Sequence, residues 1–274
     1  MFEDVSVLAS VLDILIPGNG SGKAIMAAVL LGASCGLLGC FVVLRRVALM
    51  GDAVSHAVLP GVVAGLIYSA ERSPGVIFLF AAAAGLLGAG LVRLMMFSTR
   101  LKSDAALGIV LATFFAFGIM WQSRNQQDTV GVMNFLFGNI GSIDASDLRM
   151  MLVTTLILVV TMFFLRRPLL MMSFDEGFSR GLGYPVKILD GVFYFLLTFS
   201  VVVALQAVGV VLVSAMLITP AAAAYLLTDR FERMLLLSVV FGVTSGITGG
   251  LVSAEVNGLP TGPVIALSAT MLFV

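Results

Sequence analysis

Long apolar runs separated by short polar connections make up most of this chain of 274 residues. A helix needs roughly 20 apolar residues to cross the ~30 Å hydrocarbon core of a bilayer, and many of the runs have that length. The short alternating segments of a transmembrane β-barrel are missing. The pattern therefore predicts an all-α, polytopic transmembrane helical bundle of about nine spans. We place them at 24–44, 48–69, 75–97, 105–121, 148–166, 188–205, 207–228, 234–254 and 259–274.

Three stretches depart from this regular pattern. The sixth and seventh spans form one apolar run, interrupted only near Gln206 and Gly209. The segment 122–147 carries the apolar patch FLFG, which is too short to span and is expected to lie in the membrane interface or to dip into it. Residues 1–16 begin with acidic residues, which favours a short interfacial helix over a cleavable signal peptide. The predicted domains are therefore an N-terminal extracytoplasmic segment, 1–23, and one transmembrane domain, 24–274.

Composition agrees with a membrane protein. Hydrophobic residues make up 60% of the chain and charged residues only 11%, where a soluble domain carries about 25% charged residues. The net charge is zero, so no nucleic-acid footprint is expected. Cys35 and Cys40 lie five apart on one predicted helix and face different directions, which argues against a disulfide between them. The segment PGNGSGKA resembles a phosphate-binding loop but lacks its spacing, because Pro17 and Ala24 replace the required Gly and Ser or Thr.

Basic residues are distributed unequally between the two sets of connections. Eleven lie in the odd-numbered loops and adjoining helix ends, and four lie on the opposite side. The positive-inside rule then puts the odd loops in the cytoplasm and the N-terminus outside. The longest cytoplasmic loop would be 166–187. The eleven residues are Arg45, Arg46, Arg93, Arg100, Lys102, Arg166, Arg167, Arg180, Lys187, Arg230 and Arg233.

The segment GDAVSHAVLP (51–60) places a carboxylate and the only histidine of the chain inside the second span. His56 lies about 12 Å into the helix at ~1.5 Å per residue, and Asp52 lies one turn away on the same face. An isolated charge there costs at least ~2.5–3.5 kcal/mol. Two interpretations follow: a buried structural pair, or a polar pathway across the membrane. We favour the pathway, since a carboxylate and an imidazole together suit manganese, iron or zinc.

Neighbouring residues modify this segment. Pro60 removes the hydrogen bond to the carbonyl of His56, which favours a kink at the site. Ser55 is either an auxiliary ligand or, as its type favours, bonded back to its own helix. A second proline, Pro220, falls inside the seventh span, where Thr219 or Ser214 can satisfy the freed backbone groups unless the helix breaks there.

The run RRPLLMMSFDEGFSRGLGYPVK combines charges with apolar residues. Phe174, Phe178 and Leu182 are spaced at i, i+4 and i+8, which gives one apolar stripe if the segment is helical. An apolar stripe has no purpose in a solvated loop. We therefore expect a helix that docks into a groove of a cytoplasmic partner.

Several stretches together resemble one known family. They are LRRVALMGDAVSHAVLPG (44–61), FLFGNIGSIDASDL (135–148), SFDEGFSRGLG (173–183), VGVVLVSAMLITPAAAA (208–224) and LPTGP (259–263). In this order they resemble the integral permeases of zinc/manganese/iron ABC importers, over roughly residues 24–274. The GDA-SHAVLPG segment is the most specific of them.

The resemblance implies a fold similar to the cobalamin and siderophore ABC importer permeases, in the cytoplasmic (inner) membrane of a prokaryote. It also implies partners: a second permease protomer, identical or paralogous, two cytoplasmic ATPase subunits and an extracytoplasmic metal-binding protein. The chain itself would be a transport subunit rather than an enzyme, without a permanently bound cofactor. Its cargo would be a divalent metal ion, and manganese, zinc and iron all remain open.

The resemblance also assigns residues. Asp52 and His56 correspond to the metal contacts of the translocation path. The coupling segment that meets the ATPase corresponds to Phe174, Asp175, Glu176, Phe178, Arg180 and Gly183. Ser179 and Gly181 stand where the family often has Ala, which would loosen this segment, and Gly258 stands where an acidic residue often precedes Leu-Pro.

Two other functions compete with this interpretation. An ion-coupled secondary metal transporter needs no ATPase, but it predicts inverted repeats and more intramembrane carboxylates than this sequence offers. A membrane-embedded metalloprotease would need H-E-x-x-H or further ligands, which a chain with one histidine does not supply.

Overall fold

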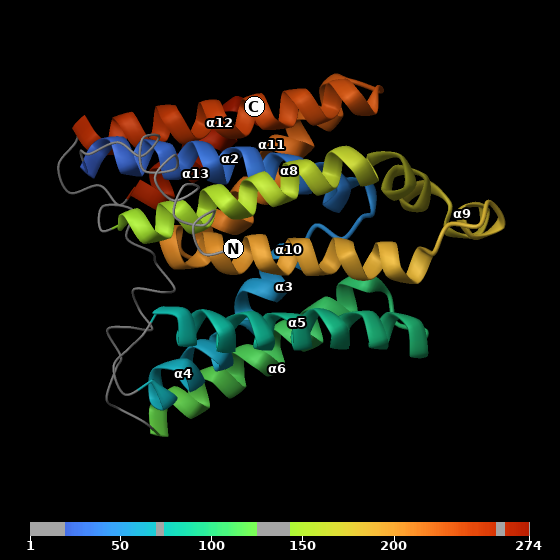
Figure 1. Cartoon of the computed structure of the whole chain (residues 1–274), viewed down its shortest axis with the longest axis horizontal. Helices are drawn as coiled ribbons and strands as arrows, with labels where there is room; N and C mark the ends of the chain where they lie inside the picture. The colour runs from blue at the N-terminus through green and yellow to red at the C-terminus, as the bar shows by residue number, and fades with distance from the viewer. Residues whose placement is uncertain (1–19, 70–73, 125–142, 256–260, 274) are drawn as a thin grey trace, which may run out of the picture.

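The structure is a computed structural model that describes residues 20–69, 74–124, 143–255 and 261–273. Every regular element in these ranges is a helix, which confirms the predicted all-α fold. The helices run roughly parallel or antiparallel in one bundle, from which the short α9 projects at one end (Figure 1). They are α2 (Gly20–Leu44), α3 (Met50–Ala57), α4 (Leu59–Tyr68), α5 (Pro74–Ser98), α6 (Ser103–Arg124), α8 (Ala145–Phe174), α9 (Glu176–Gly181), α10 (Val186–Val208), α11 (Val210–Leu227), α12 (Phe231–Glu255) and α13 (Thr261–Phe273).

Seven segments among the described residues are long and apolar enough to cross a membrane, with α3 and α4 counted together as one. The apolar helices α11 and α13 lie in the positions of the expected seventh and ninth spans but are shorter than this length. The count of about nine spans is therefore not confirmed. The expected interfacial helix at 1–16, the patch FLFG and Gly258 lie outside the described residues.

Both expected interruptions are present. The second span divides into α3 and α4 at Val58, two residues before Pro60, which occupies the first turn of α4. The sixth and seventh spans separate at Gly209, whose φ of 80° lies in the left-handed region that favours glycine. Pro220, by contrast, stays inside α11, which continues to Leu227.

Small residues let α2 and α12 pack backbone against backbone. A Cβ added to Gly32 would lie 2.3 Å from the carbonyl oxygen of Gly242, and one added to Gly242 would lie 2.4 Å from that of Gly32. One turn further along, the Ser238 hydroxyl donates to the carbonyl of Gly36 across the same interface. Small residues thus let the two helix backbones approach closely at this crossing.

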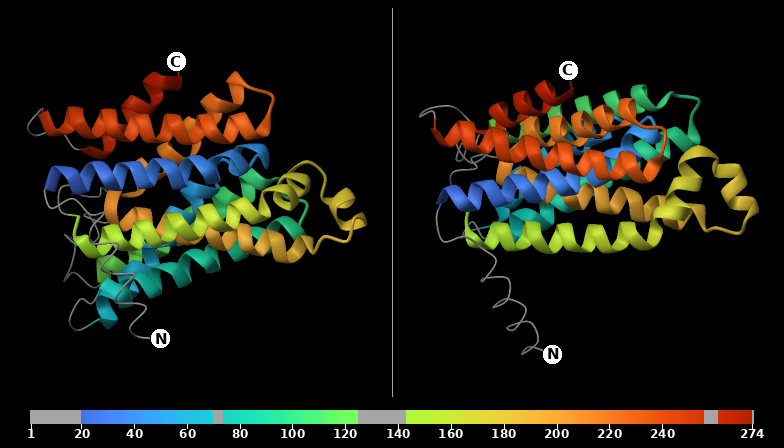
Figure 2. Two further views of the ribbon diagram at one scale, coloured as in Figure 1. Left: turned by 45° about the horizontal axis from the view of Figure 1, so that its top comes forward. Right: turned by 90° about the horizontal axis from the view of Figure 1, so that it is seen from above.

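Helix α3 lies between two groups of helices, and α4 packs with the first of them, against α5 and α6. One group contains α5 and α6, and the other contains α2, α11, α12 and α13, with α8 and α10 beside them (Figures 1 and 2). Helix α3 contacts α5, α6, α10 and α11, so it joins both groups. The fold therefore places the segment that carries Asp52 and His56 in the middle of the molecule.

Candidate functional site

Asp52 and His56 occupy the only accessible face of α3. The other six residues of this helix are buried: Met50, Gly51, Ala53, Val54, Ser55 and Ala57. The side chain of Asp52 is 35% exposed and that of His56 is 22% exposed. A helix packed on all other sides thus leaves open the two residues whose burial would be most costly.

The two side chains point toward one another along this face. Nε2 of His56 lies 3.7 Å from Oδ1 of Asp52, which is too long for a hydrogen bond. Two donors bound to one ion at about 2.1 Å in tetrahedral geometry lie roughly 3.4 Å apart. The separation thus exceeds that of a direct hydrogen bond and is close to the spacing of two ligands on one ion.

Packing orients the imidazole of His56. Its ring lies edge-on against Phe115 of α6, with centroids 5.0 Å apart and planes at 85°. Nδ1 is buried and has no hydrogen-bond partner among the described residues. Metal-ligating histidines usually donate their second N–H to an acceptor. Here the perpendicular contact with Phe115 orients the ring instead.

Ser214 of α11 is a third polar residue at this position. Its Oγ lies 3.1 Å from Oδ1 of Asp52 and 3.1 Å from the carbonyl oxygen of Val210. The single hydroxyl proton is donated to one of these acceptors at a time. The sequence indicates Ser214 only as a partner of the backbone near Pro220, and no pattern in it predicts the contact with Asp52.

Ser55 is not part of the accessible face. It is 1% exposed, and its hydroxyl donates to the carbonyl of Gly51 at 2.8 Å. Of the two roles considered for Ser55, the structure therefore shows the hydrogen bond to its own helix. No group of three His, Cys, Asp or Glu side chains within metal-binding distance occurs among the described residues. One chain thus brings only Asp52 and His56 of these residue types together on the accessible face of α3.

The predicted cytoplasmic loop 166–187 is largely helical. Helix α8 continues through Pro168 to Phe174, because Leu169 and Met172 are buried against the rest of the bundle. Asp175 then ends α8 in an extended conformation, and its side chain accepts a hydrogen bond from the N–H of Phe178 to begin α9. The expectation of one continuous stripe through Phe174, Phe178 and Leu182 is therefore wrong, because the N-cap at Asp175 separates the first from the other two.

The predicted coupling residues nevertheless lie together at the projecting tip. Phe174, the last residue of α8, is 74% exposed, and Phe178 on α9 is 59% exposed. Glu176 and Arg180 form an ion pair across one turn of α9, and Gly183 follows the helix with a φ of 83°. Ser179 is fully buried and donates to the carbonyl of Asp175, so the serine at this position supports α9.

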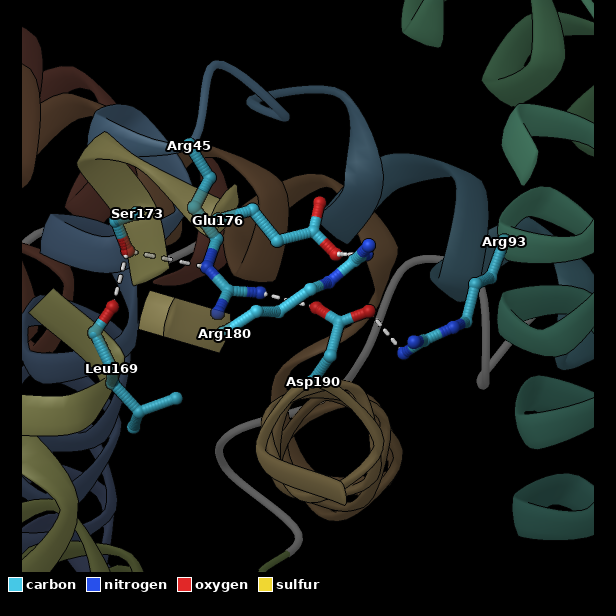
Figure 3. A network of polar contacts seen from close by, with 7 residues as sticks. All are labelled: Arg45, Arg93, Leu169, Ser173, Glu176, Arg180 and Asp190. Carbon is cyan, nitrogen blue, oxygen red and sulfur yellow. Dashed lines mark hydrogen bonds and ion pairs between the residues drawn. The ribbon is translucent and has the colours of Figure 1, made fainter. Parts of the chain in front are cut away.

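Behind α9 lies an ion network centred on Asp190 of α10 (Figure 3). Arg45, from the end of α2, donates from Nη1 to Oδ1 of Asp190 at 2.7 Å, and Arg93 of α5 pairs with Oδ2. Nε of Arg45 also donates to Oγ of Ser173, two residues before Asp175. The network and Glu176 of α9 line one cavity of about 300 Å³. The network therefore connects α2, α5, α10 and the end of α8 directly behind the projecting helix.

Comparisons with known proteins identify the family of this chain. Residues 21–274 match the ABC 3 transport family. The manganese transport system membrane protein MntC of Halalkalibacterium halodurans is 39% identical over 98% of this chain and 90% of its own length. The MntC of Bacillus subtilis is also 39% identical, over 89% of this chain, and the match spans only 57% of that longer protein. The zinc transport system membrane protein TroC of Treponema pallidum is 36% identical, over 90% of this chain and 85% of its own length.

A solved structure shows the same fold. The structure of PsaBC from Streptococcus pneumoniae in complex with Fab superposes with a TM-score of 0.81 at 34% identity, covering 97% of this chain and 94% of the matched chain. The family match and these relatives each cover nearly the whole described bundle. The chain therefore belongs to the ABC 3 transport family, as a multi-pass membrane protein related to the membrane subunits of manganese and zinc transport systems.

Proposed function

We propose that this chain is the permease subunit of an ATP-driven importer for a divalent transition metal ion, in which Asp52 and His56 contact the ion during its passage. One observation carries this proposal: on the otherwise buried α3, the only open residues are a carboxylate and the single imidazole of the chain, 3.7 Å apart. A carboxylate with an imidazole suits manganese, iron and zinc.

The passage requires ligands that bind weakly enough to release the ion. Two donors on one chain leave most of a coordination shell to water or to a second chain. Pairing with a second permease protomer, identical or paralogous, would bring two carboxylates and two imidazoles to one path. A few weak ligands favour transit over storage, because conduction needs exit as well as entry. The imidazole must be neutral to bind, so protons compete with the metal.

The energy source is proposed to act through α9. In a pair of permease chains, the exposed Phe174 and Phe178 of each chain contact one of two cytoplasmic ATPase subunits. Asp175, Glu176, Arg180 and Gly183 hold the shape of this tip. Ser173 hydrogen-bonds to Arg45, so movement of α9 has a direct mechanical connection to α2 and α10. An extracytoplasmic metal-binding protein would deliver the ion at the opposite end.

The orientation of the chain in the cytoplasmic (inner) membrane follows from the positions of its basic residues. The connections that contain the eleven basic residues all lie at the end of the bundle from which α9 projects (Figure 1). With this end in the cytoplasm, the chain obeys the positive-inside rule, and its N-terminus lies outside.

The test is metal uptake by the permease assembled with its ATPase and binding protein in liposomes. We expect Asp52→Ala and His56→Ala to abolish uptake of manganese, zinc or iron while ATP hydrolysis and assembly persist. Ser55→Ala is the matched control, since Ser55 lies on the same helix but is bonded to its own backbone. Normal uptake by both variants would reject the site and leave the family assignment intact.

The same preparation tests the competing secondary transporter. Uptake that continues without ATP and follows an imposed proton or sodium gradient would favour that function. Uptake that stops when ATP is omitted would exclude it.

A further inference from the structure

A second recess lies away from both α3 and the Asp190 network. It is a groove of about 610 Å³ between the end of α8 and the beginning of α12. The lining residues are Arg166, Arg167, Leu170, Arg230, Phe231, Glu232, Arg233, Leu235 and Leu236. Three arginines on two helices far apart in the sequence, together with Arg230 directly before α12, thus converge on one surface recess.

The charges in this groove do not balance. Glu232 is the only acidic residue of the lining, and its carboxylate lies 3.6 Å from Nη1 of Arg166. The guanidinium of Arg166 also lies over the ring of Phe163, at 5.3 Å from the centroid. Among the described residues, no carboxylate lies within ion-pair distance of Arg167, Arg230 or Arg233. The recess therefore holds surplus positive charge that favours an anion.

Beside the arginines, the same two helices also give the groove apolar lining residues. They include Leu170, Leu235 and Leu236, and Leu236 is 62% exposed. Further along α8, toward the middle of the span, Phe163 and Phe164 are 64% and 74% exposed. Such residues face acyl chains when the bundle lies in a bilayer. The arginines thus lie at the level where the hydrocarbon ends.

We propose that this groove binds an anionic phospholipid, with the phosphate of its headgroup held by the arginines and an acyl chain against the leucines. Basic recesses between membrane helices on the cytoplasmic side recognise anionic headgroups in this way. Arginine is suited to the role, because its planar fork binds phosphate oxygens in pairs. The proposal depends on the placement of the chain in a membrane and is independent of the metal and of the ATPase.

The experiment is native mass spectrometry of the purified chain released from nanodiscs of equimolar phosphatidylcholine and phosphatidylglycerol. We expect the intact chain to retain phosphatidylglycerol preferentially and Arg230→Gln/Arg233→Gln to retain at least about fivefold less, the factor that corresponds to one arginine near an anionic membrane surface. Both arginines are exposed, so their replacement leaves the core unchanged. Arg100→Gln/Lys102→Gln, two exposed basic residues at the same end but outside the groove, should retain phosphatidylglycerol normally.

A variant in the opposite direction separates lipid binding from a merely structural role. Glu232 is 82% exposed, so Glu232→Gln removes the one negative charge of the lining without disturbing packing. It should increase phosphatidylglycerol retention.

Three outcomes would overturn the proposal. Equal retention of the two lipids by the intact chain would show that the groove does not select anions. Equal losses in the groove variant and in the Arg100→Gln/Lys102→Gln control would assign the effect to overall charge. Loss of ATPase binding by Arg230→Gln/Arg233→Gln in pure phosphatidylcholine, with phosphatidylglycerol retention unchanged, would make the groove a protein contact instead.

Discussion

At the scale of single residues, the orientation of the Asp52 carboxylate depends on a partner that is distant in sequence. Ser214 approaches Asp52 from another helix, at 3.1 Å, while Ser55, only three residues away from Asp52, is turned into its own backbone. A hydroxyl that donates to a carboxylate fixes the orientation of the carboxylate. Ser214 therefore acts as a positioning residue for the proposed metal contact.

Replacement of this hydroxyl should weaken metal binding without abolishing transport. We expect Ser214→Ala to raise the metal concentration for half-maximal uptake by about tenfold, the lower limit for loss of a residue that orients a ligand. The maximal rate of ATP hydrolysis should be unchanged, and Ser214→Thr should restore affinity. Ser34→Ala is a suitable control, because the Ser34 hydroxyl is buried and bonded to the carbonyl of Leu31 in its own helix. An unchanged uptake curve for Ser214→Ala would remove Ser214 from the site.

Local rules account for Asp52 and His56 but not for Ser214. The spacing of i and i+4 in one helix predicts that Asp52 and His56 share a face, and the structure confirms it. The contact with Ser214 spans 162 positions and depends on how α11 packs on α3, so no short pattern contains it. Gly209 was partly predictable, since a glycine in an apolar run indicates that the helix breaks but does not fix where it breaks.

At the scale of elements, α9 shows how one side chain redirects a helix. Periodicity predicted a single docking helix, yet the side chain of Asp175 caps a new one and ends α8 at Phe174. The upstream residues 166–174 are helical because Leu169 and Met172 are buried against the rest of the bundle. Local periodicity does not predict this tertiary contact. The apolar surface of the tip is retained, but two separate helices now present it.

This surface gives a matched comparison within α8. Phe174 and Phe164 are both 74% exposed, but only Phe174 lies at the tip beside α9. We expect Phe174→Ala, and more so Phe174→Ala/Phe178→Ala, to reduce co-purification of the ATPase at least about tenfold, because buried aromatic anchors dominate such contacts. Phe164→Ala should co-purify normally. Equal behaviour of Phe164→Ala and Phe174→Ala would argue against α9 as the docking element.

At the scale of the whole molecule, the Asp190 network connects helices from both halves of the bundle. Arg45 is only 9% exposed, its guanidinium stacks on Phe193 at 4.2 Å, and its Nη2 has no hydrogen-bond partner among the described residues. Asp190 is therefore the main compensation for a nearly buried charge. Arg93 on the other side of Asp190 is 34% exposed and can be solvated without it.

This asymmetry predicts unequal effects on stability. Asp190→Asn should destabilise the permease by about 3 kcal/mol, since it leaves Arg45 buried without a counter-charge. Arg93→Gln should cost less, and Glu176→Gln, which breaks an ion pair more than half exposed on both sides, at most about 0.5 kcal/mol. Thermal unfolding in detergent would rank the three variants. A larger effect for Arg93→Gln than for Asp190→Asn would contradict this view of the network.

The two-donor face of α3 has a consequence for inheritance. If a working path needs two chains, the rate of transport depends on the fraction of permease pairs in which both chains are intact. In a cell that makes intact and Asp52→Ala chains equally, random pairing of identical subunits leaves about a quarter of the pairs intact, whereas pairing with a different permease leaves about half. Uptake measured against gene dosage thus counts how many copies of this chain each transporter contains. With identical subunits, an allele that loses one carboxylate would therefore reduce uptake to less than half, although it adds no harmful activity of its own.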